Sequence, residues 1–331
     1  MAIQGRLNLI TDVAGLRVGQ AENEQVRTGV SVIVPDEPCV AAVEVAGGGP
    51  GTRETDLLAG GTLVDQVDAI CLSGGSAFGL AAADGVASGL KAEGKGFGLV
   101  DAPGVPKTPI VPGAILYDLA NGGNKDWGDV SPYAMLGRQA YDGAGVEFAL
   151  GRAGAGLGAR AGLTAGGTGS ASVVTNDGLT VGALAAVNCF GSVRIPGSEA
   201  FWAWPYELDG EFGGVRPEAG LSVDPDDWGA AKANPGLGQN TTIACVATDA
   251  VLTPDEAKRV AAMALSGFSR AIRPVFAPVD GDAVFVVSTG KRMGEGPRPL
   301  LVARLGELAA GTLARAIARG VWEAEKAVVT A

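Results

Sequence analysis

Short apolar runs bounded by turn residues are the feature that most limits what this 331-residue chain can fold into. Such runs recur at 30–35, 39–46, 68–74, 180–193, 242–247 and 283–288. Their Val and Ile content, and the Gly, Asp or Pro at their borders, are typical of buried strands. No apolar stretch reaches the ~20 residues that span a bilayer. The runs therefore predict long, mostly buried β-sheets.

Helices are indicated by capping residues between and after these strand groups. Residues 253–256, Thr-Pro-Asp-Glu, form a capping box with Pro at the first helical position, and apolar residues follow at helical spacing until Pro274. Ser-Pro at 131–132 predicts a second helix, and the apolar spacing over 305–317 predicts a third. Because helices and strands do not alternate strictly, we expect an α+β fold of sheets covered by helices.

Charge and cysteine usage narrow the class of protein. The formal net charge is −11 without any basic run, so phosphate backbones would be repelled and neither nucleic acid nor a membrane is an expected partner. The N-terminus lacks the pattern of a secretory signal. Cys39, Cys71, Cys189 and Cys245 lie singly in apolar runs, which predicts buried reduced thiols in a cytoplasmic protein.

The sequence contains no histidine. This absence excludes Ser-His-Asp and Cys-His catalysis, zinc sites that use histidine, and an imidazole general base. Any enzyme built from this chain must use another base.

Asn240, Thr241 and Thr242 stand directly before the apolar run at 243–247. A threonine exposed by cleavage after Asn240 would carry a free α-amine with a pKa of ~8, which can accept the proton of its own hydroxyl. This N-terminal-nucleophile chemistry needs no histidine. Two plainer interpretations compete: an N-glycosylation sequon without a secretion signal, or polar residues that start a strand after a turn.

The forty residues 201–240 that precede this step lose all periodicity. We expect a long, mobile surface segment, and a loop of that length within a compact domain needs a functional reason.

Three further positions carry candidate chemistry. Asp280 and Asp282 flank a glycine before the run at 283–288; they form either an acidic turn or a pair that orients a hydroxyl and its ammonium. Asn188 lies inside an apolar run, so its amide either makes a structural hydrogen bond or stabilises an oxyanion. Tyr117 ends another apolar run, where a phenol is most often part of the core.

Gly-rich turns at 47–54 and 74–79 follow strands, but no lysine follows them as in a phosphate-binding loop. Gly156, Gly158 and Ala161 match the loose dinucleotide pattern GxGxxA without a framing βαβ unit. We interpret these glycines as sites of close packing, and an oxidoreductase remains a weak alternative.

The motifs together resemble the N-terminal-nucleophile amidohydrolases that include L-aminopeptidase/D-esterases, β-peptidyl aminopeptidases and nylon-oligomer (6-aminohexanoate-oligomer) endohydrolases. The resemblance covers nearly the whole chain, at ITDVAGLRVGQ (10–20), GGGPGTRETDLL (47–58), AICLSGGSAFGLAAADGV (69–86), TPIVPGAILYDL (108–119), GRAGAG (151–156), AAVNCFGSV (185–193), QNTTIACVATDA (239–250) and PVDGDAVFVVSTG (278–290).

The resemblance implies a four-layer αββα sandwich made as one inactive chain that cuts itself before a Ser or Thr. Here the bond would be Asn240–Thr241, giving a large fragment 1–240 and a small fragment 241–331 that together form one structural domain. Members assemble as homotetramers or larger rings. They need no metal or cofactor, and their substrates are small amides or peptides.

Residue roles also follow from the resemblance. Thr241 would be the nucleophile, and Asp280 and Asp282 would match the acidic pair that supports it. Asn188 would match the asparagine that stabilises the oxyanion, and Tyr117 would match the active-site tyrosine.

Two positions depart from the family pattern. Leu163, with Arg160 close by, stands where nylon-oligomer hydrolases carry an active-site lysine. Ile115 stands where the aminopeptidases carry a glutamate that binds the substrate's ammonium. We therefore favour an amidase for internal or ω-amino amides. An aminopeptidase, a D-amino-acid amidase/esterase, a pantetheine-type amidase and a non-catalytic binding protein on the same scaffold remain alternatives.

Overall fold

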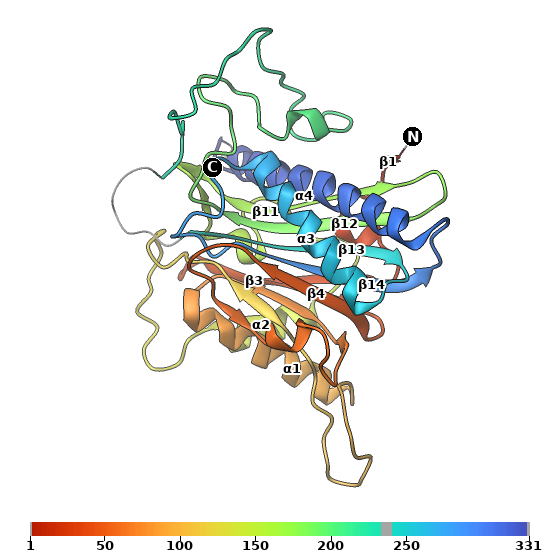
Figure 1. The fold of residues 1–331 in the computed structure, drawn as a ribbon. Helices are drawn as coiled ribbons and strands as arrows, with labels where there is room; N and C mark the ends of the chain where they lie inside the picture. Colours follow the sequence, from red (N-terminus) through yellow and green to blue (C-terminus); the bar gives the residue numbers. More distant parts are fainter. Residues whose placement is uncertain (1, 233–239, 330–331) are drawn as a thin grey trace.

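Two β-sheets packed face to face form the centre of the protein (Figure 1); the computed structural model describes residues 2–232 and 240–329. The larger sheet contains, in spatial order, β1 (Ile3–Gln4), β11 (Gly167–Val174), β12 (Thr180–Asn188), β13 (Thr241–Ala250), β14 (Ala283–Arg292), β4 (Cys39–Val45) and β6 (Gln66–Val67). The smaller sheet contains β2 (Leu16–Asn23), β3 (Thr28–Pro35), β7 (Ile70–Ser73), β8 (Gly113–Ile115) and β5 (Thr52–Arg53). A short hairpin joins β9 (Arg160–Ala161) to β10 (Thr164–Ala165).

Helices cover the outer face of each sheet. The pair α3 (Pro254–Ala271) and α4 (Arg298–Val329) packs on the larger sheet, and the pair α1 (Ala82–Ala92) and α2 (Tyr133–Asp142) packs on the smaller one (Figure 1). The α+β fold and the four-layer αββα sandwich expected from the sequence are therefore confirmed.

Strand β13 shows why the predicted strands are apolar on both faces. Ile243, Cys245 and Ala247 lie in the core between the two sheets. Ala244 and Val246 point the other way, into the core beneath α3 and α4. A central strand of a sheet that is covered on both faces needs apolar residues at every position.

The elements predicted from apolar runs and caps are present. Each predicted run contributes a strand, in order β3, β4, β7, β12, β13 and β14. The capping box is formed as expected: the Thr253 side chain accepts a hydrogen bond from Glu256 N at 3.3 Å, and Glu256 Oε2 accepts one from Thr253 N at 2.9 Å. Local hydrogen bonds of this kind can be read directly from sequence.

Strand β11 has the sequence GTGSASVV and is not an apolar run, so the sequence did not predict it. It lies so close to α4 that a Cβ on Gly169 would stand 1.9 Å from the Ala316 carbonyl oxygen. The Ser170 hydroxyl meanwhile donates to the Ala183 carbonyl on β12 at 2.7 Å. Small residues are required here by helix contact, which overrides strand propensity.

Helix α1 was missed for a related reason, because its Gly-rich sequence AADGVASGLKA resembles a turn. A Cβ on Gly85 would stand 1.9 Å from the Ala134 carbonyl oxygen at the start of α2. The two helices therefore approach each other along small residues, and the contact offsets the low helix propensity of glycine.

The described part of the segment 201–240 is anchored in the fold, although its only helix is the short 3-10 turn η5 (Trp204–Tyr206). Phe201 and Phe212 are buried in the core that α4 covers, and their rings meet edge to face at 5.5 Å. Residues 233–239 lie outside the described residues. The mobility expected for the whole segment stays a prediction.

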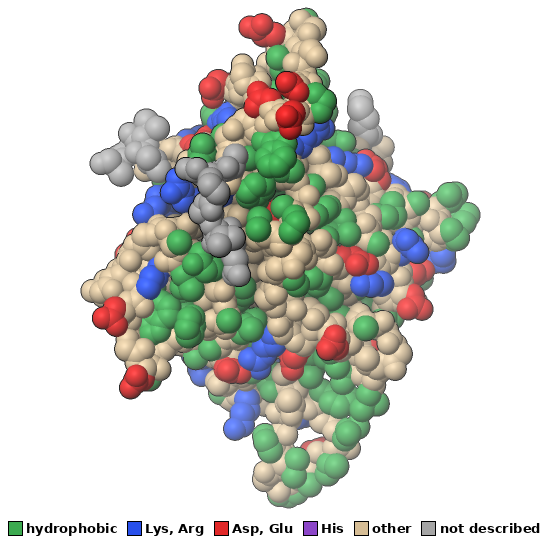
Figure 2. Space-filling model, turned by 60° about the vertical axis from the view of Figure 1, so that its left-hand side comes forward, with side chains coloured by type: hydrophobic (Ala, Val, Ile, Leu, Met, Phe, Trp, Pro, Cys, Tyr) green, Lys and Arg blue, Asp and Glu red, His purple; other side chains and the backbone are tan. Residues whose placement is uncertain are grey.

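The described surface agrees with the composition. On the face that Figure 2 shows, acidic and basic side chains are scattered among hydrophobic and other residues. All four cysteines are free and buried, as expected. Among the described residues, no helix combines the length and the apolar composition that crossing a bilayer requires, and this includes the 32-residue α4.

A buried ion pair fixes the segment after 201 to the helix layer. Arg315 on α4 pairs with Glu211, and both side chains are 3% exposed. The same guanidinium donates to Asn8 Oδ1 at 3.0 Å and to the Ser172 carbonyl at 2.9 Å. Removing one partner would leave the other charge buried and unpaired.

We therefore expect Arg315→Met to lower the free energy of unfolding by about 3–5 kcal/mol. The control is Arg304→Met, which breaks a more exposed pair with Asp177 and should cost less than about 1 kcal/mol. Urea unfolding of both variants measures the difference. Equal losses would show that the buried pair does not hold the segment.

Candidate functional site

Thr241 lies at the meeting point of three chain segments. It is the first residue of β13, and the antiparallel register with β12 places it opposite Asn188. The preceding residue, Asn240, bridges to Asp280 just before β14. Asn188, Asn240, Thr241 and Asp280 are all buried. The sheet thus brings together residues that the sequence separates by about ninety positions.

The peptide bond between Asn240 and Thr241 is held at its carbonyl oxygen. Gly281 N donates to the Asn240 oxygen at 2.9 Å, and the Thr241 hydroxyl donates to the same oxygen. Asn240 N in turn donates to the Val279 carbonyl at 3.1 Å. The Thr241 hydroxyl oxygen therefore lies against the carbonyl that precedes it, and the oxygen of that carbonyl also accepts a backbone N–H.

Asp280 holds the surrounding loops. Its Oδ1 accepts a hydrogen bond from Phe190 N and its Oδ2 accepts one from Ala277 N, both at 3.2 Å. Burial raises the pKa of the Asp280 carboxyl, although these amides and the Lys232 ammonium act in the opposite direction. Asp280 thus joins the end of β12 to the loop before β14.

Asp282 holds the start of β13. Its Oδ1 accepts from Thr242 N at 2.7 Å, and its Oδ2 accepts from Phe276 N at 3.3 Å. Burial raises its pKa strongly, and the neighbouring Asp280 charge raises it further. Both acidic residues therefore bind backbone amides around Thr241, and the Thr241 hydroxyl itself is directed to the Asn240 carbonyl.

The glycines of the 47–49 turn pack against the acidic turn. Gly49 N donates to the Asp280 carbonyl at 2.7 Å, and Gly47 N donates to the Asp282 carbonyl at 3.2 Å. A Cβ on Gly47 would stand 2.4 Å from the Asp280 carbonyl oxygen, and one on Gly281 would stand 2.7 Å from Thr241 Oγ1. Glycine at these positions leaves room for the Thr241 hydroxyl and for close backbone contact.

Asn188 makes structural hydrogen bonds, the first of the two roles that the sequence left open. Its Oδ1 accepts from Arg160 N at 2.9 Å and from Asn121 Nδ2 at 3.1 Å, while its Nδ2 donates to the Tyr117 carbonyl at 2.9 Å. These bonds fix the amide orientation, and an amide nitrogen carries a second hydrogen that can serve a substrate oxygen. Tyr117 contacts Asn188 through its backbone.

Lys232 is a site residue that the sequence analysis missed. Its Nζ donates to Asn240 Oδ1 at 2.7 Å and to the Asn188 carbonyl at 3.4 Å. Burial lowers the pKa of this lysine to about 8, against the raising effects of Cys189 and Asp280. The residue belongs to the aperiodic segment, where a lone lysine among small residues, eight positions before Asn240, was the sole signal.

Leu163 and Ile115, the two departures from the family pattern, lie in different surroundings. Leu163 is 60% exposed, and its backbone N donates to the Ala230 carbonyl at 2.8 Å. Ile115 is buried, and its side chain reaches the space beside Gly51. Arg160 contacts the site through its backbone N–H, and its side chain is exposed.

The GxGxxA match does not form a nucleotide site. A Cβ on Gly156 would stand 2.1 Å from Thr168 N, and one on Gly158 would stand 2.3 Å from the Arg27 carbonyl oxygen. The protein's own backbone fills the space that a pyrophosphate would need. These glycines serve close packing, as interpreted from the sequence.

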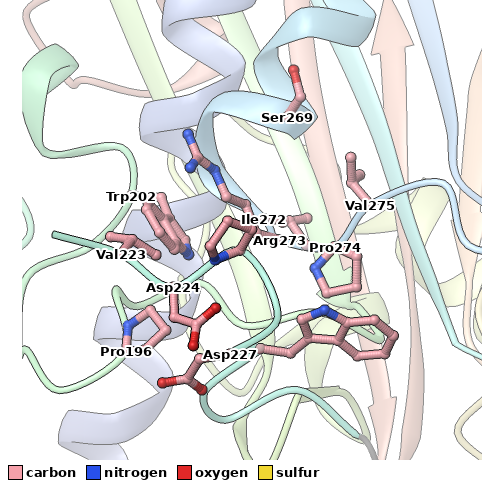
Figure 3. A pocket seen from close by; sticks show the side chains of 12 residues that line it. Pro196, Trp202, Val223, Asp224, Asp227, Ser269, Ile272, Arg273, Pro274 and Val275 are labelled. Carbon is pink, nitrogen blue, oxygen red and sulfur yellow. The ribbon is translucent and has the colours of Figure 1, made fainter.

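A separate pocket of about 520 Å³ is shown in Figure 3. Its link to the Thr241 site is indirect: the ring of Trp228, one of its lining residues, meets the Phe190 ring at 6.0 Å, and Phe190 N donates to Asp280. The pocket is lined by Pro196, Trp202, Val223, Asp224, Pro225, Asp227, Trp228, Ser269, Ile272, Arg273, Pro274 and Val275. Its walls thus combine aromatic and apolar surface with two carboxylates.

Arg273, the arginine of this pocket, is turned away from those carboxylates. The Arg273 guanidinium lies over the Trp202 ring, with Cζ 4.0 Å from the ring centroid. Figure 3 shows Asp224 and Asp227 on the opposite side of Trp202 from the guanidinium. A cation–π contact of this kind holds the arginine against the wall.

Comparisons with known proteins agree with this geometry. A family model described as peptidase family S58 matches residues 8–331. An uncharacterized aminopeptidase of Mycobacterium tuberculosis is 41% identical, over 96% of this chain and 95% of its own length. A 6-aminohexanoate-oligomer endohydrolase of Kocuria is 32% identical, over 86% of this chain and 76% of its own.

A solved structure shares the fold. It is an L-aminopeptidase D-Ala-esterase/amidase from Ochrobactrum anthropi, described as a variant of the Ntn hydrolase fold. The TM-score is 0.67 at 20% identity, covering 97% of this chain and 87% of that one.

The raised pKa of Asp282 makes a prediction about stability. The carboxyl ionises in the unfolded chain from about pH 4, whereas the folded protein keeps its proton to higher pH. Its contribution to stability is therefore complete at low pH and is lost as the pH rises, by up to about 1.4 kcal/mol per pH unit. Asp282→Asn should remove this slope, measured as Tm between pH 5 and 8.

The matched control is Asp177→Asn. The hydrogen bond from Arg304 holds the pKa of Asp177 well below its usual range, so this residue is already ionised over the same interval. The control should therefore keep the wild-type slope. An unchanged slope in Asp282→Asn would mean that the Asp282 carboxyl is already ionised at pH 5.

Proposed function

The chain belongs to peptidase family S58, and from this premise we propose that it is a self-processing threonine amidohydrolase. The family assignment makes it a hydrolase of amide bonds. One observation supports the finer proposal above all others: the buried Thr241 hydroxyl lies against the Asn240 carbonyl, whose oxygen accepts the Gly281 N–H. A chain without histidine needs a base of another kind, and a freed threonine amine supplies it.

Self-cleavage would proceed by an acyl shift. The Thr241 oxygen attacks the Asn240 carbonyl carbon, and Gly281 N–H stabilises the oxyanion at the Asn240 oxygen. The C–N bond then breaks, and the proton of the hydroxyl passes to the Thr241 nitrogen, leaving an ester. Water hydrolyses this ester to an Asn240 carboxylate and a free Thr241 with its hydroxyl restored.

The mature enzyme would repeat the same chemistry on a substrate. The neutral Thr241 amine accepts the hydroxyl proton as the oxygen attacks the substrate carbonyl. Asn188, with a second amide hydrogen, donates to the developing oxyanion, and Tyr117 is the further candidate at this position. The protonated amine then gives its proton to the leaving amine, and water releases the acyl group.

We propose small peptides or linear amide oligomers of the 6-aminohexanoate type as substrates. The relative from Kocuria is named for such oligomers. Ile115 cannot hold a terminal ammonium, which favours cleavage of internal or ω-amino amides over strict removal of an N-terminal residue. The pocket beside Phe190 offers apolar surface and carboxylates to the remainder of an extended cationic amide.

An aminopeptidase or a D-amino-acid amidase/esterase is the second candidate, because the Mycobacterium tuberculosis relative is named an aminopeptidase. The two candidates differ in their need for a free amine. We expect comparable kcat/KM on p-nitroanilides with free and with blocked amines, and cleavage of 6-aminohexanoate oligomers. A loss of more than about hundredfold on blocking the amine would favour the aminopeptidase.

The decisive test of self-processing is Thr241→Ala. The wild-type chain of 33.0 kDa, divided in proportion to the residues of 1–240 and 241–331, should give bands near about 24 and 9 kDa. The variant should remain whole and lack amidase activity, because its only lost atoms are the reacting oxygen and a methyl group. Denaturing electrophoresis and sequencing of the new amino end measure the result.

The matched control is Thr242→Ala. The Thr242 hydroxyl is buried and has no hydrogen-bond partner among residues 2–232 and 240–329, so its removal should leave cutting intact. Amidase activity in uncut Thr241→Ala protein would reject the proposed mechanism. A homotetramer of processed units, as the family resemblance implies, stays a prediction.

A further inference from the structure

Lys232 binds the side chain of Asn240, the residue that precedes the proposed cleavage bond. Its ammonium donates to Asn240 Oδ1 at 2.7 Å and reaches the Asn188 carbonyl at 3.4 Å. Its backbone N donates to the Phe190 carbonyl at 2.8 Å, so the residue is tied to the end of β12 by main chain and side chain. Lys232 thus links the end of β12 to the residue that precedes β13.

We infer that Lys232 is a positioning residue for self-cleavage, which fixes the Asn240 side chain and so holds the Asn240 carbonyl against the Thr241 hydroxyl. This inference rests on the proposed function, because it concerns the cleavage step of that same site. Lys232 acts through Asn240 and does not touch the reacting carbonyl.

The backbone and the side chain of Asn240 are held by different groups. The backbone is held by Val279 and Gly281, both of the loop before β14. The side chain is held by Lys232, which belongs to the opposite side of the site at the end of β12. Two holds from opposite sides restrict rotation about the Asn240 backbone, and attack on a carbonyl requires such a fixed approach.

The chemistry of this contact suits a positioning role. The ammonium donates to two oxygens that carry no formal charge, and hydrogen bonds to a charged donor are stronger than neutral ones. Desolvation of a lysine is costly, so a partly buried ammonium is maintained only where such bonds offset its lost hydration. The ammonium makes the stronger contact, because the neutral amine keeps two N–H donors but has lost the charge that strengthens them.

The contact should therefore weaken as the pH rises. Burial lowers the pKa of Lys232 to about 8, while Cys189 and Asp280 raise it and Arg160 lowers it. Asp282 is a further titratable group in this cluster, since it acts on Cys189 as Lys232 and Asp280 do. Burial and the Asp280 charge raise the pKa of the Asp282 carboxyl. Lys232 is protonated below this range, so the contact with Asn240 is strongest near pH 7 and weakens through about pH 8 to 9.

The experiment follows self-cleavage of newly made chains. Cell-free translation with a radioactive pulse, followed by denaturing electrophoresis over time, gives the first-order rate for each variant. We expect Lys232→Met to slow cutting by about ten- to hundredfold, the range for loss of a hydrogen bond from a charged group. Lys232→Arg, which keeps the charge and a donor, should restore part of the rate.

A double-mutant cycle separates positioning from general destabilisation. In an Asn240→Ala chain the lysine has no side chain to hold, so adding Lys232→Met should change the rate by less than about twofold. The matched control is Lys258→Met on α3, since Lys258 Nζ also donates to a backbone carbonyl, that of Val43 at 2.6 Å. It should cut at the wild-type rate.

A pH series supplies a readout that a merely structural role would not move. The ratio of the wild-type rate to the Lys232→Met rate should be largest near pH 7 and should fall between about pH 8 and 9, as Lys232 loses its charge. If the Met variant does not fold, Lys232→Gln, a neutral donor of similar shape, carries the same series.

The outcomes are distinguishable. A wild-type chain that never cuts overturns the proposed function and this inference with it. A wild-type chain that cuts, beside a folded Lys232→Met chain that cuts at the same rate, overturns the inference alone. Equal slowing by Lys232→Met with and without the Asn240 side chain also overturns it, because the lysine would then act elsewhere.

Discussion

The pairing of β13 with its two neighbours is the constraint on which the rest of the site depends. Antiparallel hydrogen bonding to β12 places Thr241 opposite Asn188, and parallel pairing with β14 brings the 280–282 turn beside the same end. A slip of one residue would reverse the face of every side chain on β13. Ile243 and Ala244 are buried on opposite faces, so a slip would exchange large and small side chains between two closely packed cores.

The same burial that fixes the register also sets the electrostatics. Desolvation raises the pKa of the Asp280 and Asp282 carboxyls, which favours their protonated forms, and lowers the pKa of Lys232, which favours its neutral form. These groups hold backbone amides and the Asn240 side chain, so the proton balance of the site is coupled to its geometry. A protein without histidine thereby has several groups that titrate closer to neutrality than usual.

Much of the fold could be predicted because its elements carry local signals. Apolar runs marked the central strands, and the box at 253–256 marked α3. Strand β11 and helix α1 were not predicted, because their small residues are required by close contacts with α4 and α2, which lie far away in sequence. For the site, the resemblance placed Thr241, Asn188 and the acidic pair together. The contacts of Lys232 and of the Gly281 N–H with Asn240 depend on the folded path of the backbone, so they could be found only from the structure.

The position of β13 and β14 within the larger sheet has a consequence for the life of the molecule. Both strands follow residue 240, yet strands that precede it flank them on either side. A chain cut there would become two interleaved polypeptides that cannot part without dismantling the sheet. Refolding after denaturation would then change from a unimolecular to a bimolecular reaction, so the uncut precursor would be the form in which this architecture is most readily built.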